Sequence, residues 1–115
     1  MCDILNDLPE PENPQQTIYV MHMPPAGLRL GQLLYQDLDI GSVDIYEFLK
    51  ERQLLLSLHG HIHESPDMPK GRWINQIRGT ICIQTGQTEL HNNDMVCAEI
   101  DLQSMEYSRK VINVK

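Results

Sequence analysis

Positive charge is scarce in this sequence of 115 residues, which has nine Lys and Arg against sixteen Asp and Glu and a formal net charge of −7. A protein that grips nucleic acid or an anionic membrane needs a basic patch to displace counterions. The composition therefore argues against nucleic acid as a scaffold partner. A phosphate ester or a nucleotide stays open as a ligand, provided that metal ions or a local cluster supply the positive charge.

Long hydrophobic runs and paired cysteines are also missing. The longest apolar stretch, residues 54–58, is interrupted by Ser57 and is far shorter than the ~20 residues of a membrane-spanning helix. Cys2, Cys82 and Cys97 are widely spaced without a C-x-x-C pair, and the first residues do not have the pattern of a signal peptide. We therefore expect a soluble, cytoplasmic protein with reduced thiols and no membrane partner.

The chain divides near residue 16. Residues 1–16 carry four acidic residues, three prolines and no Lys or Arg, a composition typical of segments that do not order themselves. The remaining length is that of about one domain. We expect an acidic, proline-rich linker or tail over residues 1–16 and one domain over residues 17–115.

The first half of this domain reads as strand, loop, helix and strand. Residues 17–22 are β-branched and aromatic and predict a short strand that delivers His22 to a loop. Ser42 is a helix cap, and the apolar stripe of the helix consists of Ile45, Phe48 and Leu49. Residues 54–58 are apolar on both faces, which is typical of a central strand in an α/β sheet.

The second half reads mainly as strands. Residues 79–87 predict a strand followed by a Gly-containing turn, and Cys82 is a small core residue on that strand. Residues 96–102 alternate apolar and polar side chains, which predicts a half-buried strand. Residues 106–114 are its expected hairpin partner across a turn near residues 103–105.

Three of the five histidines fall within "LHGHIHESP", residues 58–66. An H-x-H pair rooted in a tight turn can point both rings to one side, and neutral imidazole is a common ligand of divalent metals. In open α/β sheets, sites form at the carboxyl ends of the strands. Since His22 stands at such an end too, we expect it to converge with His61 and His63. His59 is more simply a hydrogen-bonded histidine at a strand end.

The segments "VMHMPPAG" and "HGHIHESP", with "QTGQ" downstream, resemble the last two histidine motifs and the closing turn of calcineurin-like metallophosphoesterases. The pair of H-x-P-P and G-H-x-H about forty residues later, across a helix and an apolar strand, is specific. The resemblance runs from about Ile18 to the end. It implies an α/β fold, namely the C-terminal half of a metallophosphoesterase-type sandwich with a mixed sheet flanked by helices.

The resemblance also implies an activity, the metal-dependent hydrolysis of phosphate mono- or diesters at a dinuclear site. His22 and His61 would bind the second metal ion and His63 the first, and no separate catalytic residue is nominated. Manganese, iron, zinc and nickel are all compatible with such ligands. "QTGQ" departs from the Asn-Pro-Gly turn of many relatives, which leaves the geometry of that turn open.

The earlier motifs of the family, D-x-H, G-D-x-x-D and G-N-H-D or G-N-H-E, have no counterpart in this sequence. The sequence is compatible with a truncation, a mis-started reading frame or one half of a split protein. We expect the chain to hold at most one weakly bound metal and to be inactive alone. We also expect self-association or an N-terminal partner half that covers an apolar row comprising Val96, Ala98, Ile100 and Leu102.

Two other classes of function stay open. The first is a non-catalytic interaction scaffold that keeps the metallophosphoesterase fold. The second is a structural zinc module in which the three ligand histidines are joined by Cys82 or His91 in a closed tetrahedral site. Among the other polar or aromatic residues, Glu64 and Asp67 read as solvated loop carboxylates, and Trp73 reads as a packing or substrate-rim residue.

Overall fold

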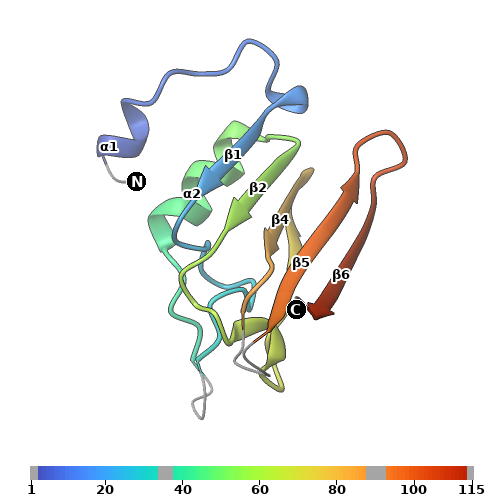
Figure 1. Cartoon of the computed structure of the whole chain (residues 1–115). Helices are drawn as coiled ribbons and strands as arrows, with labels where there is room; N and C mark the ends of the chain where they lie inside the picture. The colour runs from blue at the N-terminus through green and yellow to red at the C-terminus, as the bar shows by residue number, and fades with distance from the viewer. Residues whose placement is uncertain (1–2, 34–37, 88–92, 114–115) are drawn as a thin grey trace.

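The computed structural model describes residues 3–33, 38–87 and 93–113, and within them the chain has a mixed α/β fold, as the sequence predicts. A four-stranded sheet has the order β1-β2-β4-β3, and β5 and β6 form a separate antiparallel pair (Figure 1). The strands are β1 (Ile18–Met21), β2 (Leu56–His59), β3 (Ile74–Ile77), β4 (Thr80–Gln84), β5 (Asp94–Asp101) and β6 (Glu106–Asn113). The α-helices are α1 (Asp3–Asn6) and α2 (Val43–Arg52).

The strands β1, β2 and β4 are parallel, and their register brings their carboxyl ends together. Met21 lies opposite His59, and His59 lies opposite Gln84. The loops after β1, β2 and β4 therefore leave the sheet side by side. This register explains how histidine motifs separated by about forty residues in the sequence reach one edge of the fold.

Two strands differ from the sequence expectation. β2 begins at Leu56 rather than at residue 54, because Gln53 ends α2 in the left-handed conformation at φ 52° and the chain needs two residues to turn back. The central place of β2 between β1 and β4 is as predicted. β3 had no counterpart in the prediction, since Asn75 and Gln76 interrupt its apolar pattern. It pairs antiparallel with β4 and makes the sheet mixed.

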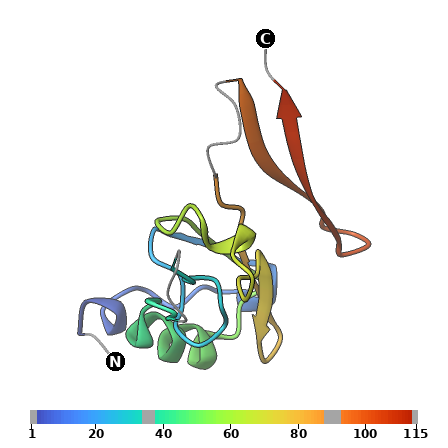
Figure 2. The same ribbon diagram turned by 90° about the horizontal axis from the view of Figure 1, so that it is seen from below.

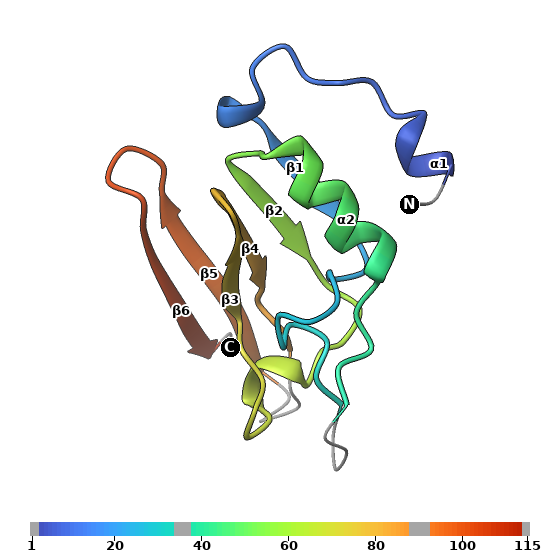
Figure 3. The same ribbon diagram turned by 180° about the vertical axis from the view of Figure 1, so that it is seen from behind.

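Helix α2 covers one face of the four-stranded sheet (Figure 3). The Ser42 hydroxyl accepts a hydrogen bond from the Ile45 N–H at 3.2 Å, so the predicted cap is confirmed. The predicted stripe of Ile45, Phe48 and Leu49 is buried and packs with Cys82, which is fully buried as expected. In the part of the chain that the structure describes, no helix combines the length and apolar character needed to cross a bilayer.

The segment before β1 is held against the end of α2. The Arg52 guanidinium donates to the carbonyl oxygens of Leu8 at 2.8 Å and Pro9 at 3.0 Å, and it lies 4.8 Å from the centre of the Phe48 ring. The Tyr19 hydroxyl also donates to Pro9. With the bond that the Leu55 N–H donates to the Pro14 carbonyl at 3.1 Å, these hydrogen bonds tie the acidic segment to the domain, and its role as a linker or tail stays a prediction.

The sheet face opposite α2 is apolar and partly open along β1. Because side chains alternate along a strand and Tyr19 packs on the α2 side, Ile18 and Val20 point to the other side. Val20 is 79% exposed and Ile18 is 40% exposed. We call Ile18 and Val20 the outer face of β1. Since β1 is also an edge strand, this region offers an apolar surface beside an unpaired strand edge.

The β5–β6 hairpin matches the predicted pair of strands and projects away from the four-stranded sheet (Figure 2). The expected apolar row is only partly buried. Val96 is buried, and Ala98 and Ile100 are half-buried. Leu102 is 54% exposed. It lies beyond β5 in a turn whose Gln103 N–H donates to the Asp101 carboxylate, and the alternation of the strand does not continue there.

The base of the hairpin is anchored by Arg109. Its guanidinium donates to both carboxylate oxygens of Asp67 at 3.1 Å, and its Nε donates to the Thr85 carbonyl at 2.8 Å. Asp67 is exposed, as expected for a loop carboxylate, but it is also an ion-pair partner. Arg109 therefore joins β6 to the loops after β2 and β4.

We expect Arg109→Ala to lower the free energy of unfolding by about 2 kcal/mol, because three charge-assisted hydrogen bonds are lost together. Lys110→Ala is the matched control: it removes the same charge from the neighbouring position, where Lys110 pairs with Glu99 at 2.9 Å on an exposed surface. That pair is worth less than about 1 kcal/mol. Urea denaturation measures both variants, and an equal loss in the two would contradict the anchoring role of Arg109.

Candidate metal centre

Two histidine-bearing loops begin at neighbouring strand ends. His22 comes directly after β1, and Gly60 and His61 come directly after β2. The loops are fastened to each other because the Gly60 N–H donates to the His22 carbonyl at 2.9 Å. His22 thus stands at a strand end, as predicted, and its backbone is fixed by the residue that precedes His61.

The structure brings the side chains of His22 and His61 together. The Nε2 atom of His22 is 3.0 Å from the Nδ1 atom of His61, and the ring centroids are 4.8 Å apart at an interplanar angle of 73°. Both residues are exposed to solvent. The predicted convergence of these two histidines is therefore confirmed as geometry.

His61 adopts a backbone conformation that L-residues rarely use. Its φ of 71° lies in the left-handed region, which costs a non-glycine residue ~1–3 kcal/mol and persists where surrounding contacts enforce it. Here the Gly60 carbonyl accepts from the Ile62 N–H at 2.9 Å and from the Gln84 side-chain amide. The sheet thus holds His61 in a strained backbone that turns its ring toward His22.

His63 is not joined to this pair. It is exposed, and its carbonyl accepts a hydrogen bond from the Gln87 N–H at 2.9 Å. No group of three or more His, Cys, Asp or Glu residues able to hold a metal occurs among residues 3–33, 38–87 and 93–113. The structure therefore gathers two of the three histidines that the sequence nominates.

The "QTGQ" turn, which begins at the last residue of β4, closes over the histidine loop as its resemblance to a closing turn suggests, but the contacts of Gln84 and Gly86 were not predicted from the sequence. The amide group of Gln84 is buried and donates to Gly60. Gly86 has φ 73°, and a Cβ atom there would lie 2.7 Å from the His63 carbonyl oxygen and 2.8 Å from the Pro66 ring. Only glycine fits this approach. The feature of the sequence that could have indicated this turn is Gly86 between Gln84 and Gln87.

His59 is hydrogen-bonded through both ring nitrogens, as the sequence suggests for a histidine at a strand end. Its Nδ1 contacts the Met23 carbonyl and its Nε2 contacts the Ser57 hydroxyl, both at 2.8 Å. Burial lowers the pKa of His59 to about 4, against hydrogen bonds to the backbone of Met23 and Met21 that raise it. The imidazole is therefore neutral at pH 7 and has no free nitrogen for a metal.

The long loop after His22 is organised by Asp39 and by Ser65. The Asp39 carboxylate accepts hydrogen bonds from the N–H groups of Gly27, Arg29 and Gly41 at 2.8–3.1 Å. The Ser65 hydroxyl donates to the Arg29 carbonyl at 3.1 Å and accepts from the Gln32 N–H at 2.8 Å. Because Ser65 comes just after the histidine motif, these bonds seat the loop beside the candidate centre.

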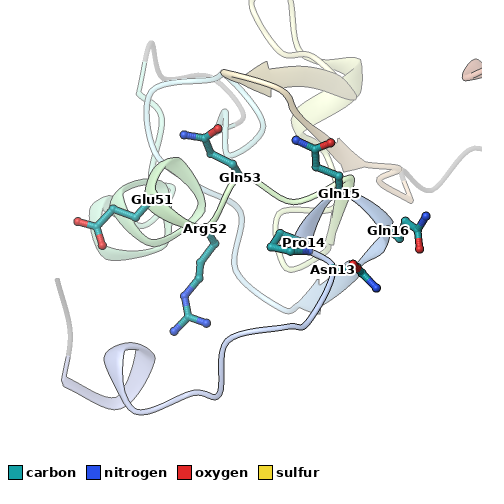
Figure 4. Close-up of a pocket in the computed structure, with 7 residues that line it drawn as sticks. All are labelled: Asn13, Pro14, Gln15, Gln16, Glu51, Arg52 and Gln53. Atoms are coloured by element: carbon teal, nitrogen blue, oxygen red, sulfur yellow. The ribbon is translucent and has the colours of Figure 1, made fainter.

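A pocket of about 500 Å³ lies elsewhere, at the opposite end of β1 (Figure 4). Residues 13–16 and 51–53 line it, and most of them are amide side chains. Its Arg52 already donates to Leu8 and Pro9. Since His22 stands at the other end of the strand, the pocket and the histidines do not form one site, and the chemistry of the histidines is the better guide to function.

The donor set of His22 and His61 fits one divalent metal ion. The 3.0 Å between His22 Nε2 and His61 Nδ1 is a hydrogen bond between the two rings, whereas two nitrogens bound to one tetrahedral ion at ~2.1 Å lie ~3.4 Å apart, so the rings would exchange this hydrogen bond for the ion by a small shift. Imidazole also suits zinc, nickel, copper and iron. Two ligands on an exposed edge leave most of the coordination sphere open, so binding through this pair alone would be weak.

The closed zinc module that would use Cys82 is not assembled in the described residues. Cys82 is fully buried in the core under α2, where burial raises the pKa of its thiol. It does not join His22 and His61 in a metal-holding group. His91, the other proposed fourth ligand, lies outside the described residues. The zinc-module alternative therefore has no support from Cys82.

Comparison with protein-family models, with curated proteins and with solved structures gives no significant match to this chain. The resemblance to metallophosphoesterases is thus carried by the motifs alone.

Proposed function

We propose that this chain contributes histidine ligands to a metal-dependent hydrolase of phosphate mono- or diesters. The observation that carries the proposal is the 3.0 Å approach of His22 Nε2 and His61 Nδ1 at the carboxyl edge of parallel strands. The strained backbone of His61 supports it, because such strain concentrates at functional sites. The motif resemblance supplies the class of substrate.

In this proposal His22 and His61 bind one divalent ion, and His63 binds a second. When bound, such ions polarise phosphoryl oxygens and supply a nucleophilic solvent at neutral pH. The residues of this chain would bind the ions and orient the histidine ligands. Gln84 and Gly60 fix the backbone of the histidine loop, and the exposed edge leaves room for a phosphate ester.

A dinuclear site needs carboxylate ligands in addition to histidines. In the described ranges, no group of three or more His, Cys, Asp or Glu residues is placed to hold a metal ion. We therefore propose that a second polypeptide, another copy or a chain that carries the acidic ligands, completes the site. The outer face of β1 supports this, since Val20 is 79% exposed. Exposed apolar surface next to a strand edge is typical of interaction sites.

A zinc titration of the pure chain, with inorganic phosphate added afterwards, tests the proposal. We expect one weakly bound Zn²⁺ and phosphate binding that occurs only in its presence, because an open coordination sphere accepts an anion. Zinc binding without phosphate binding would favour a closed structural site. The absence of any zinc binding would overturn the metal role and leave a non-catalytic interaction scaffold.

We expect the chain alone to hydrolyse a nitrophenyl phosphodiester no faster than a metal-containing buffer. Three imidazoles do not make the two bridged metal sites that in-line displacement needs. Manganese, zinc and nickel should each be assayed. Robust turnover that His61→Ala abolishes would contradict this expectation and would mean that carboxylates are recruited within the chain.

We expect the chain to associate at micromolar concentration through the outer face of β1. Light scattering should give a molar mass above that of the 13.3 kDa monomer, and Val20→Glu should lower it. Val43→Glu is the matched control, because Val43 is 66% exposed at the start of α2, away from the sheet. A monodisperse wild-type monomer with cooperative unfolding would contradict the association.

A further inference from the structure

His59 occupies the centre of the carboxyl edge of the sheet. It ends β2, with Met21 of β1 opposite on one side and Gln84 of β4 opposite on the other. Its ring is half-buried, and both nitrogens have partners. A side chain in this position touches the loop that bears His22 without facing solvent as His22 and His61 do.

The two partners of His59 determine where its ring proton lies. A carbonyl oxygen only accepts, so Nδ1 must carry the proton and donate it to Met23. The Nε2 lone pair then accepts a hydrogen bond from the hydroxyl of Ser57, which is fully buried. The Met23 carbonyl thus selects the tautomer, and the Ser57 hydroxyl, which can donate or accept, satisfies the remaining nitrogen.

These contacts fix the backbone directly after the His22 side chain. The ring of His59 holds the carbonyl of Met23, and the next residue, Gly60, donates its N–H to the carbonyl of His22. The residue after that is His61, whose Nδ1 meets the ring of His22. Three consecutive residues, His59, Gly60 and His61, therefore all contact the loop that bears His22.

We infer that His59 is a positioning residue, which acts through the Met23 carbonyl to hold His22 in place for the metal that His22 and His61 share. The inference rests on the proposed function. His59 is not a ligand itself, because both of its ring nitrogens are engaged inside the sheet edge. Contacts that orient a metal ligand in this way change metal affinity by about 10–100-fold when they are lost.

Two variants test the inference with Zn²⁺ as the probe. His59→Phe keeps a ring and loses both hydrogen bonds, and it should weaken zinc binding of the folded protein at least about tenfold. His59→Asn places an amide N–H near the position of Nδ1, so it should restore affinity to within about threefold of wild type. Calorimetric titration well below the unfolding temperature measures both. A merely structural role would lower the stability of both variants and leave the affinity of the folded fraction unchanged.

The outcomes separate the two claims. If wild type binds no zinc, the proposed function fails. If wild type binds zinc and the folded Phe variant binds it equally well, the positioning role fails while the proposed function stands. A measurement on wild type covers the case in which a variant does not fold: the nitrogen NMR spectrum of His59 should show the proton on Nδ1. A proton on Nε2 would overturn the inference.

Discussion

Replacing His61 or His22 by alanine is expected to weaken zinc binding about 100-fold, because each substitution reduces a two-imidazole site to a single ligand. Both side chains are exposed, so their removal leaves the core intact and the free energy of unfolding nearly unchanged. Metal content after dialysis and a calorimetric titration measure the effect. The two substitutions should act alike if the pair shares one ion, as we propose.

His91→Ala is the control for these variants, because the sequence gives His91 no place in either motif. It should leave metal content unchanged. The assignment would be reversed by loss of metal with His91→Ala and retention with His61→Ala. A double substitution of His22 and His61 that costs no more than either single change would support one shared ion.

Acidification is expected to destabilise the fold through His59. Its pKa is about 4 in the folded chain against 6.5 for the free side chain, so the folded state favours the neutral ring. The resulting stability is present above pH 6.5 and is lost as the pH falls toward 4, by about 3 kcal/mol in all. Below that pH the ring is protonated in both states and the loss is complete.

The difference between wild type and His59→Asn isolates this contribution, because both proteins share the carboxylates that titrate in the same range. Urea denaturation at several pH values gives the free energy of unfolding for each. Wild type should lose more stability between pH 6.5 and 4 than the Asn variant does. Parallel curves for the two proteins would show that His59 is not the group responsible.

The elements predicted correctly from the sequence are those with one regular spacing of apolar residues or one strong local signal, such as a helix cap. Ser42 at the cap and the stripe with Phe48 predicted α2 because a helix buries residues three and four apart. The strand before His22 was predicted for similar reasons, since β-branched residues run into Pro24 and Pro25. The convergence of His22 and His61 came from one rule, that parallel strands end on the same side.

The missed features depend on contacts between distant parts of the chain. β3 carries Asn75 and Gln76, whose polarity conceals a strand that only its pairing with β4 reveals. The roles of Gln84 and Gln87 arise from hydrogen bonds to the histidine loop and to β5, and no local pattern encodes them. The position of His63 outside the pair depends on the direction of a loop, which spacing does not fix.

Gln87 connects the β5–β6 hairpin to the loop that bears His63. Its N–H donates to the His63 carbonyl, while its side chain accepts from the Val96 N–H and donates to the Asp94 carbonyl. One residue therefore ties the start of β5 to the loop of the second histidine motif. A protein that binds the projecting hairpin and displaces β5 would therefore also displace the backbone of His63 through these three hydrogen bonds.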